Sequence, residues 1–252
     1  MPLATAPATA STYWSLSRAP RYSLTFALPL LVLYEAMALA VNPSSGLVIR
    51  NGADVLLKGL AASLLGERGP AVFGVLLVAG LVGLAARDAW THPGGLRPRV
   101  LVVMLLEAAA LAVAFGIVVG LVTAQLLNLA SLAIGQIESV AWPTALMVSL
   151  GAGLYEELLF RVLLVSALLF AARTLLGLSR GPAGVFAVVV GALIFSAFHY
   201  VGPYGDALQA PSFVFRAVAG VAFSALYVIR GFGITAWTHA LYDVFLLAAT
   251  GR

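Results

Sequence analysis

Residues 100–128 read VLVVMLLEAAALAVAFGIVVGLVTAQLLN, a run in which Glu107 is the single ionisable side chain. A helix of about 20 apolar residues spans the hydrocarbon core of a bilayer, which is ~30 Å thick. The run is rich in Leu and Ala and lacks the alternation of polar and apolar residues that a half-buried strand would show. It therefore predicts a membrane-spanning helix, and it indicates that the fold is set by a bilayer.

The composition of the whole chain agrees with a membrane protein. Of its 252 residues, 62% are hydrophobic and 10% are charged, whereas soluble domains carry about 25% charged residues. The chain has no cysteine, which excludes disulfides and thiolate metal sites. Its net charge of +4 comes mostly from arginines between apolar runs. No basic stretch is interleaved with aromatics, so we expect lipid head groups rather than nucleic acid as partners. No partner protein can be inferred.

Further apolar runs predict the remaining spans. They lie at residues 23–42, 71–87, 144–172, 183–199, 212–229 and 232–250. Residues 52–66 carry Asp54 and Lys58 among leucines and predict a shorter amphipathic helix at the membrane interface. The predicted fold class is all-α, a polytopic transmembrane helical bundle of about seven spans plus one interfacial helix. The predicted divisions are an N-terminal tail at 1–22, N-terminal transmembrane helices at 23–128 and a helical core at 140–250.

The distribution of basic residues predicts the topology. Arg18 and Arg21 precede the first span, and residues 129–142 and 200–211 contain no Lys or Arg. Because Lys and Arg are enriched in cytoplasmic loops, this favours a cytoplasmic N-terminus and, with seven spans, an outside C-terminus. The basic residues from Arg50 to Arg68 argue against this orientation.

Ionisable residues inside the predicted spans gather in three motifs. Residues 151–161 read GAGLYEELLFR and hold Glu156, Glu157 and Arg161, residues 195–199 read FSAFH, and residues 239–243 read HALYD. Such groups are costly in a bilayer and are functional-site hypotheses by default. Glu157 and Arg161 are spaced for an ion pair along a helix. Glu156 is rotated by about 100° from Glu157, so it would face the cavity as a candidate base.

The other two motifs supply imidazoles. His199 ends the second motif, and His239 and Asp243 share one helix face. A carboxylate and an imidazole in a desolvated pocket can deprotonate water and later protonate a leaving amine, and a second His can stabilise the oxygen that becomes charged. Each feature alone also fits a structural Glu–Arg staple, a packing His or a proton relay in a transporter. Three of them on separate helices favour a catalytic site.

Gly151 and Gly153 allow close helix approach just before the glutamates. Glu35 and Glu107, in the first and third spans, are expected to pair with cations of neighbouring helices or to line the cavity.

The ordered patterns EExxxR, FxxxH and HxxxN/D resemble those of the CPBP family, which comprises type II CAAX prenyl endopeptidases and bacteriocin-processing enzymes and is also called the ABI family. The resemblance covers roughly residues 140–250. It implies an intramembrane peptidase, a helical bundle with a conical cavity, in which Glu156 and His199 activate water. By the same carry-over, His239 and Asp243 would stabilise the tetrahedral oxyanion, with Glu157 and Arg161 in support.

One position departs from the eukaryotic pattern. Eukaryotic members carry Asn where this chain has Asp243, and an ionised Asp accepts hydrogen bonds but cannot donate them. Asp243 would therefore either be protonated or orient His239.

The resemblance leaves the metal question open, because the family has been described both as metalloproteases and as metal-free enzymes. The sequence has no HExxH motif. If zinc were bound, Glu156, His199 and His239 could supply three ligands. We favour catalysis without a cofactor, with zinc as the alternative.

The expected function is therefore an endopeptidase that hydrolyses peptide bonds of membrane-tethered or hydrophobic substrates, placed in the bacterial cytoplasmic (inner) membrane. The alternatives are a non-catalytic membrane scaffold or immunity protein, and a carboxylate-relay transporter.

The predicted topology places the histidines at different depths. Glu156 and His199 would lie ~24 Å from the cytoplasmic face but His239 only ~10 Å, at 1.5 Å per residue. Either the connection near Gly231 and Gly233 enters the membrane, or the spans tilt, or the predicted boundaries are wrong.

Overall fold

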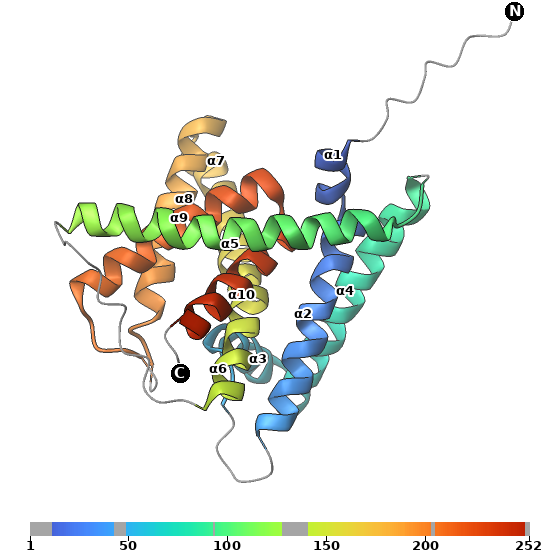
Figure 1. Ribbon diagram of the computed structural model, residues 1–252, viewed down its shortest axis with the longest axis horizontal. Helices are drawn as coiled ribbons and strands as arrows, with labels where there is room; N and C mark the ends of the chain where they lie inside the picture. Colours follow the sequence, from blue (N-terminus) through green and yellow to red (C-terminus); the bar gives the residue numbers. More distant parts are fainter. Residues whose placement is uncertain (1–11, 43–48, 93, 128–140, 203–204, 250–252) are drawn as a thin grey trace, which may run out of the picture.

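The fold is all-helical in every range that the computed structural model describes, namely residues 12–42, 49–92, 94–127, 141–202 and 205–249 (Figure 1). The N-terminal elements are α1 (Tyr13–Arg18), α2 (Pro20–Val41), α3 (Gly52–Leu65), the short 3₁₀ turn η1 (Gly66–Arg68), α4 (Gly69–Thr91) and α5 (Pro98–Leu126). The C-terminal elements are α6 (Trp142–Gly151), η2 (Ala152–Val165), α7 (Ser166–Thr174), α8 (Arg180–Phe198), α9 (Ala210–Arg230) and α10 (Phe232–Ala249). The predicted all-α class is confirmed.

Six helical segments of the described ranges are long and apolar enough to cross a membrane. They are Pro20–Val41, Gly52–Thr91, Pro98–Leu126, Arg180–Phe198, Ala210–Arg230 and Phe232–Ala249. The predicted segment 144–172 is also helical, but it is divided into α6, η2 and α7, each too short to span alone. The backbone stays in the right-handed helical region at Ala152 and Ser166, where these elements join. The protein is therefore an integral, multi-pass membrane protein.

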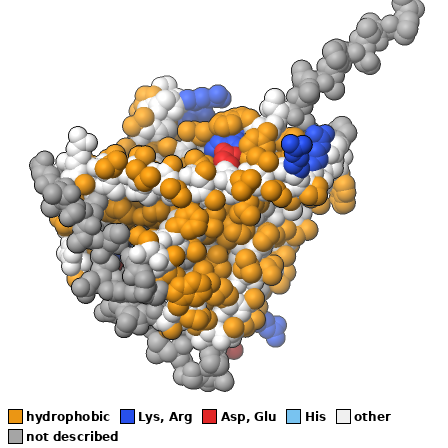
Figure 2. Space-filling view, viewed as in Figure 1, with side chains coloured by type: hydrophobic (Ala, Val, Ile, Leu, Met, Phe, Trp, Pro, Cys, Tyr) orange, Lys and Arg blue, Asp and Glu red, His pale blue; other side chains and the backbone are white. Residues whose placement is uncertain are grey.

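The surface is as apolar as a bilayer environment requires. Hydrophobic side chains cover most of the face seen in Figure 2, across which α5 runs. Leu106, Val113 and Leu121 of α5 are exposed on this helix. An apolar surface of this extent would be unfavourable in water, and in lipid it faces acyl chains.

Residues 1–22 were predicted as a tail, but helix α1 begins within them at Tyr13 and α2 begins at Pro20. Thr12 caps α1 by accepting a hydrogen bond from the Ser15 amide, and Pro20 occupies the first turn of α2. Proline suits this position because the first helical N–H groups have no intrahelical partner. Arg21 is already buried and pairs with Asp88 of α4 at 3.6 Å. The remainder of the predicted tail, residues 1–11, lies outside the described ranges.

The helix predicted near residues 52–66 forms as α3, and the polar side chains at its start are buried. Asn51 caps it, with Oδ1 accepting a hydrogen bond from the Ala53 amide at 2.9 Å. Asn51 and Asp54 are 2% and 0% exposed, so the polar start of α3 faces the protein interior. The interfacial position of this helix stays a prediction.

Glu107 joins the N-terminal helices to α9, as the sequence suggested. Both Glu107 carboxylate oxygens accept hydrogen bonds from Arg230, at 2.6 Å and 2.7 Å. The Tyr13 hydroxyl donates to the same carboxylate, and the Arg230 guanidinium lies 4.0 Å from the Trp14 ring centroid. A bidentate Arg–carboxylate pair is stronger than a single hydrogen bond. The Glu107–Arg230 pair joins α5 to α9, and the contacts of Tyr13 and Trp14 join α1 to both.

Glycines let α10 cross its neighbours at close range. A Cβ atom on Gly153 of η2 would lie 2.3 Å from the Ala236 carbonyl oxygen of α10, and one on Gly233 would lie 2.3 Å from the Ser23 carbonyl oxygen of α2. Residues 232–236 are buried, so α10 starts inside the protein. Figure 1 shows α10 inclined to both α2 and α6. This inclination supports tilted spans, one of the three explanations left open for the different depths of the histidines; the depths themselves stay a prediction.

Candidate active site

The paired glutamates lie on η2, whose residues Ala152–Val165 form wide π-helical turns. Such turns are rare and are found frequently at functional sites. The start of this segment is pressed against α2 and α3, since a Cβ atom on Gly151 would lie 2.5 Å from the Tyr34 ring and 2.7 Å from Asn51 Cβ. This contact directs the following residues of η2 toward the start of α3.

Glu157 contacts two side chains through one carboxylate oxygen. Its Oε1 lies 3.1 Å from Arg161 Nη1 and 2.6 Å from His239 Nδ1. The side chains of Glu157 and Arg161 are almost completely buried. The ion pair expected from the sequence is present, whereas the contact with His239, 82 residues away, was not predicted.

Arg161 is held by aromatic rings as well as by Glu157. Its guanidinium carbon lies 4.5 Å from the Phe195 centroid and 5.4 Å from the Phe223 centroid. Within the described residues, its three guanidinium nitrogens have no hydrogen-bond acceptor of good geometry. The buried charge is therefore compensated by the ion pair and by cation–π contacts.

His239 lies between two carboxylates. Its Nδ1 faces Glu157, and its Nε2 lies 3.8 Å from Asp243 Oδ2. The imidazole stacks on Phe223 with the ring centroids 4.2 Å apart. His239 and Asp243 lie on the same side of α10, as their spacing predicted. Asp243 is 28% exposed, which makes this side of the cluster accessible.

Glu156 has a different hydrogen-bond partner from Glu157. It is buried, and its Oε1 accepts a hydrogen bond from Asn51 Nδ2 at 2.9 Å. Its charge lies within electrostatic range of His199, His239 and Arg161. Sequence reasoning missed Asn51, because only its position before a helix was noticeable and nothing local indicates a contact with a residue 105 positions away.

His199 stands at the C-terminal end of α8. Its Nδ1 lies 2.9 Å from the Phe195 carbonyl oxygen. A carbonyl can only accept, so Nδ1 carries the proton and Nε2 is the nitrogen that remains for chemistry. Glu156 and His199 are not in direct contact, since no ion pair joins them within 4.0 Å. The structure thus brings both side chains to one cluster without pairing them.

Comparison with known proteins gives one match, in the C-terminal part of the chain. Residues 138–245 match the family model described as type II CAAX prenyl endopeptidase Rce1-like. This segment is similar to the Rce1-like family. The match confirms the predicted family resemblance, and at the level of the family it indicates a protease. The search of curated proteins found no match to the chain, and neither did the search of solved structures.

All six residues predicted for the site fall within the Rce1-like segment, whereas Asn51 lies outside it. The N-terminal half of the protein therefore contributes a direct contact to Glu156. This contact joins α3 to η2 across the boundary of the family match.

The arrangement does not assemble a recognisable metal centre. Within the described residues, no group of three His, Asp or Glu side chains is placed to hold a metal ion, and Glu156, His199 and His239 do not form one. The Nδ1 atoms of both histidines already face Phe195 and Glu157.

The cavity implied by the resemblance does not coincide with the pocket of about 650 Å³ near the start of α2. That pocket is lined by residues of α1, α2, α4 and α9 and by Phe232 at the start of α10, and none of its lining residues is a motif residue. We therefore expect a substrate to reach the motif residues from the side of His199 and Asp243, which are partly exposed.

Proposed function

We propose that the protein is an intramembrane endopeptidase that hydrolyses peptide bonds of membrane-tethered or hydrophobic substrates, with Glu156 and His199 activating the attacking water. The supporting observation is the unequal use of the two glutamates. Glu157 is occupied by Arg161 and His239, whereas Glu156 accepts a single hydrogen bond, from a neutral amide, within the described structure. Each glutamate keeps a second carboxylate oxygen without a partner among the described residues, but the adjacent Arg161 cation disfavours proton uptake by Glu157 and complete burial keeps that carboxylate from water, which leaves Glu156 as the base.

The reaction balances with these groups. Glu156 removes a proton from water, and the resulting hydroxide attacks the scissile carbonyl carbon to give a tetrahedral oxyanion. His199 Nε2 accepts a hydrogen bond from the second O–H of the water and thereby orients it. When the oxyanion collapses, the C–N bond breaks and Glu156 returns its proton to the leaving amine. The products are a new carboxyl terminus and a new amino terminus.

His239 is proposed to stabilise the oxyanion. As an imidazolium it donates from both ring nitrogens, with Nδ1 to Glu157 and Nε2 toward the reacting oxygen. Asp243, 3.8 Å from Nε2, would orient the ring and balance its charge. Orienting His239 is one of the two roles that the sequence left open for Asp243. In this role Asp243 can stay ionised, because it does not have to donate a hydrogen bond.

The substrate class follows from the location of the site. The motif residues lie in helices of a membrane bundle, so a peptide must reach them from the bilayer or from its surface. We propose a bacterial inner-membrane location, a cytoplasmic N-terminus and substrates that are hydrophobic or anchored in the membrane. The family description names prenylated substrates, but the proposed chemistry requires only a peptide bond.

The test is proteolysis by the full chain purified in detergent. Two sets of peptides are offered, C-terminally farnesylated peptides and unlipidated hydrophobic peptides, and products are identified by mass spectrometry. We expect cleavage by the wild type, loss of at least about 100-fold in kcat for His199→Ala, and no effect of a chelator. Equal cleavage by wild type and His199→Ala would refute the assigned site, and chelator sensitivity would show that a metal takes part.

A further inference from the structure

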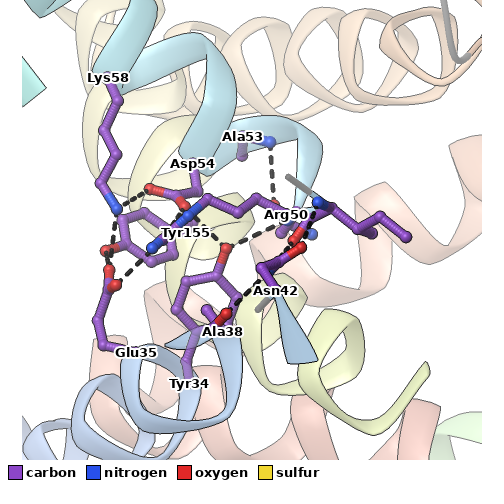
Figure 3. A network of polar contacts seen from close by, with 11 residues as sticks. Tyr34, Glu35, Ala38, Asn42, Arg50, Ala53, Asp54, Lys58 and Tyr155 are labelled. Carbon is purple, nitrogen blue, oxygen red and sulfur yellow. Dashed lines mark hydrogen bonds and ion pairs between the residues drawn. The ribbon is translucent and has the colours of Figure 1, made fainter. Parts of the chain in front are cut away.

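A polar network packs against η2, and each of its members except Tyr155 lies outside the Rce1-like segment. We call it the α2–α3 network, and Figure 3 shows it at close range; its members are Tyr34, Glu35, Arg50, Asp54, Lys58 and Tyr155. Arg50 lies 3.0 Å from Glu35 and 2.8 Å from Asp54, and Lys58 lies 2.9 Å and 2.8 Å from the same two acids. Two cations and two carboxylates thus compensate one another.

The network continues to Asn51 through Tyr34. The Tyr34 hydroxyl donates to Asp54 Oδ2 at 2.7 Å and accepts the backbone N–H of Asn51 at 3.2 Å. Tyr34 and Asn51 are both buried. Gly151 lies so close to both residues that a side chain there would collide with them. The backbone of Asn51 is therefore fixed from two sides.

The orientation of the Asn51 amide group is fixed by its other contacts. Oδ1 accepts the Ala53 N–H at 2.9 Å, which leaves Nδ2 directed at Glu156 Oε1, also at 2.9 Å. The opposite orientation would place an NH₂ group against an N–H and an oxygen against a carboxylate, so it is excluded on chemical grounds. Asn51 thus donates to Glu156, and it cannot do otherwise while it caps α3.

We propose that Asn51 is a positioning residue for hydrolysis: its amide holds Glu156 Oε1, so that Oε2 is presented to the attacking water. The α2–α3 network keeps Asn51 in place, and the N-terminal half of the chain is thereby part of the working site. The proposal rests on the proposed function, because it gives Glu156 the role of base. Asn51 touches neither substrate nor water in this scheme and acts through Glu156.

Two substitutions separate positioning from capping. Asn51→Ser keeps an oxygen that can cap α3 but is too short to reach Glu156, and Asn51→Asp keeps the cap but presents a carboxylate in place of the donor. We expect both proteins to fold, with kcat lowered on the order of 10- to 100-fold, the range for a hydrogen bond to a charged group. KM should change by less than about threefold, because the lost contact does not bind substrate.

The pH dependence of kcat gives a second readout, measured with the peptide that the wild type cleaves fastest. In Asn51→Ser the acid limb of the profile should move to higher pH, because the carboxylate has lost a donor to its charged form. A smaller folded fraction would lower the whole profile without moving it. The matched control is Asn42→Ser, since the Asn42 side chain hydrogen-bonds the backbone of Ala38 and Ile49 and does not contact Glu156.

The outcomes distinguish this proposal from the proposed function. Wild-type kcat and an unmoved profile in Asn51→Ser, with Glu156→Gln inactive, would overturn the positioning role alone. A Glu156→Gln protein as active as the wild type, or a wild type that cleaves none of the peptides, would overturn both. Loss of activity in Asn42→Ser to the same extent as in Asn51→Ser would mean that the activity is sensitive to any change between α2 and α3, and it would also overturn the positioning role.

Discussion

Replacing Glu156 by glutamine is expected to lower kcat by about 10²- to 10⁴-fold, the range contributed by a positioned general base. Glutamine has nearly the same shape, but its amide cannot take a proton from water at neutral pH. Its carbonyl oxygen can still accept the hydrogen bond from Asn51, so the fold should persist. The measurement is kcat for peptide cleavage in detergent, together with the thermal unfolding midpoint.

The control for this change is Glu67→Gln, because Glu67 is exposed and lies in the short η1 turn away from the motifs. Its kcat and stability should match those of the wild type. If Glu156→Gln retained kcat within about threefold of the wild type, proton transfer by this carboxylate would contribute nothing measurable. The assignment of Glu156 as base would then be wrong.

The second large effect concerns stability. Arg161→Ala is expected to lower the free energy of unfolding by about 3–5 kcal/mol, because removing one partner of a buried ion pair leaves the other charge uncompensated. Glu157 is 0% exposed and, among the described residues, would keep His239 alone as a partner. The lost stacking on Phe195 and Phe223 adds to the cost. Chemical unfolding in detergent, followed by far-ultraviolet circular dichroism, measures the change.

Arg173→Ala is the matched control, since Arg173 lies on the same helical segment but is exposed. It should change stability by no more than about 0.5 kcal/mol. The double variant Glu157→Ala/Arg161→Ala should be less destabilised than the sum of the single changes, because no charge is left unpaired. Equal stability of Arg161→Ala and Arg173→Ala would contradict the structural role given to this pair.

The helices could be predicted from the sequence because each apolar run is long and nearly free of charge. Residues 100–128 became α5 with only small changes at the ends. The division of the run at 144–172 into α6, η2 and α7 could not be predicted, because the Leu- and Ala-rich sequence fits α and π turns equally well. Helix α2 begins at Pro20, three residues before the predicted span, because proline is favourable in the first turn of a helix.

The site could be predicted where its contacts are local. The Glu157–Arg161 pair and the shared face of His239 and Asp243 follow from four-residue spacing on one helix. Contacts between helices were beyond this reasoning, because they depend on crossing angles. Gly153 lets α10 approach η2 closely enough for His239 to reach Glu157, and the sequence indicated close approach there without naming the neighbour.

A single turnover in H₂¹⁸O, with enzyme in excess over peptide, distinguishes activation of water by Glu156 from direct attack on the substrate by its carboxylate. If Glu156 acts as a base, the new carboxyl terminus carries one ¹⁸O atom and the enzyme peptide that contains Glu156 carries none, as read by mass spectrometry. If Glu156 instead attacked the substrate itself, hydrolysis of the resulting anhydride at the glutamyl carbon would leave ¹⁸O in Glu156 and an unlabelled product. Label in Glu156, or a product without label, would contradict the account.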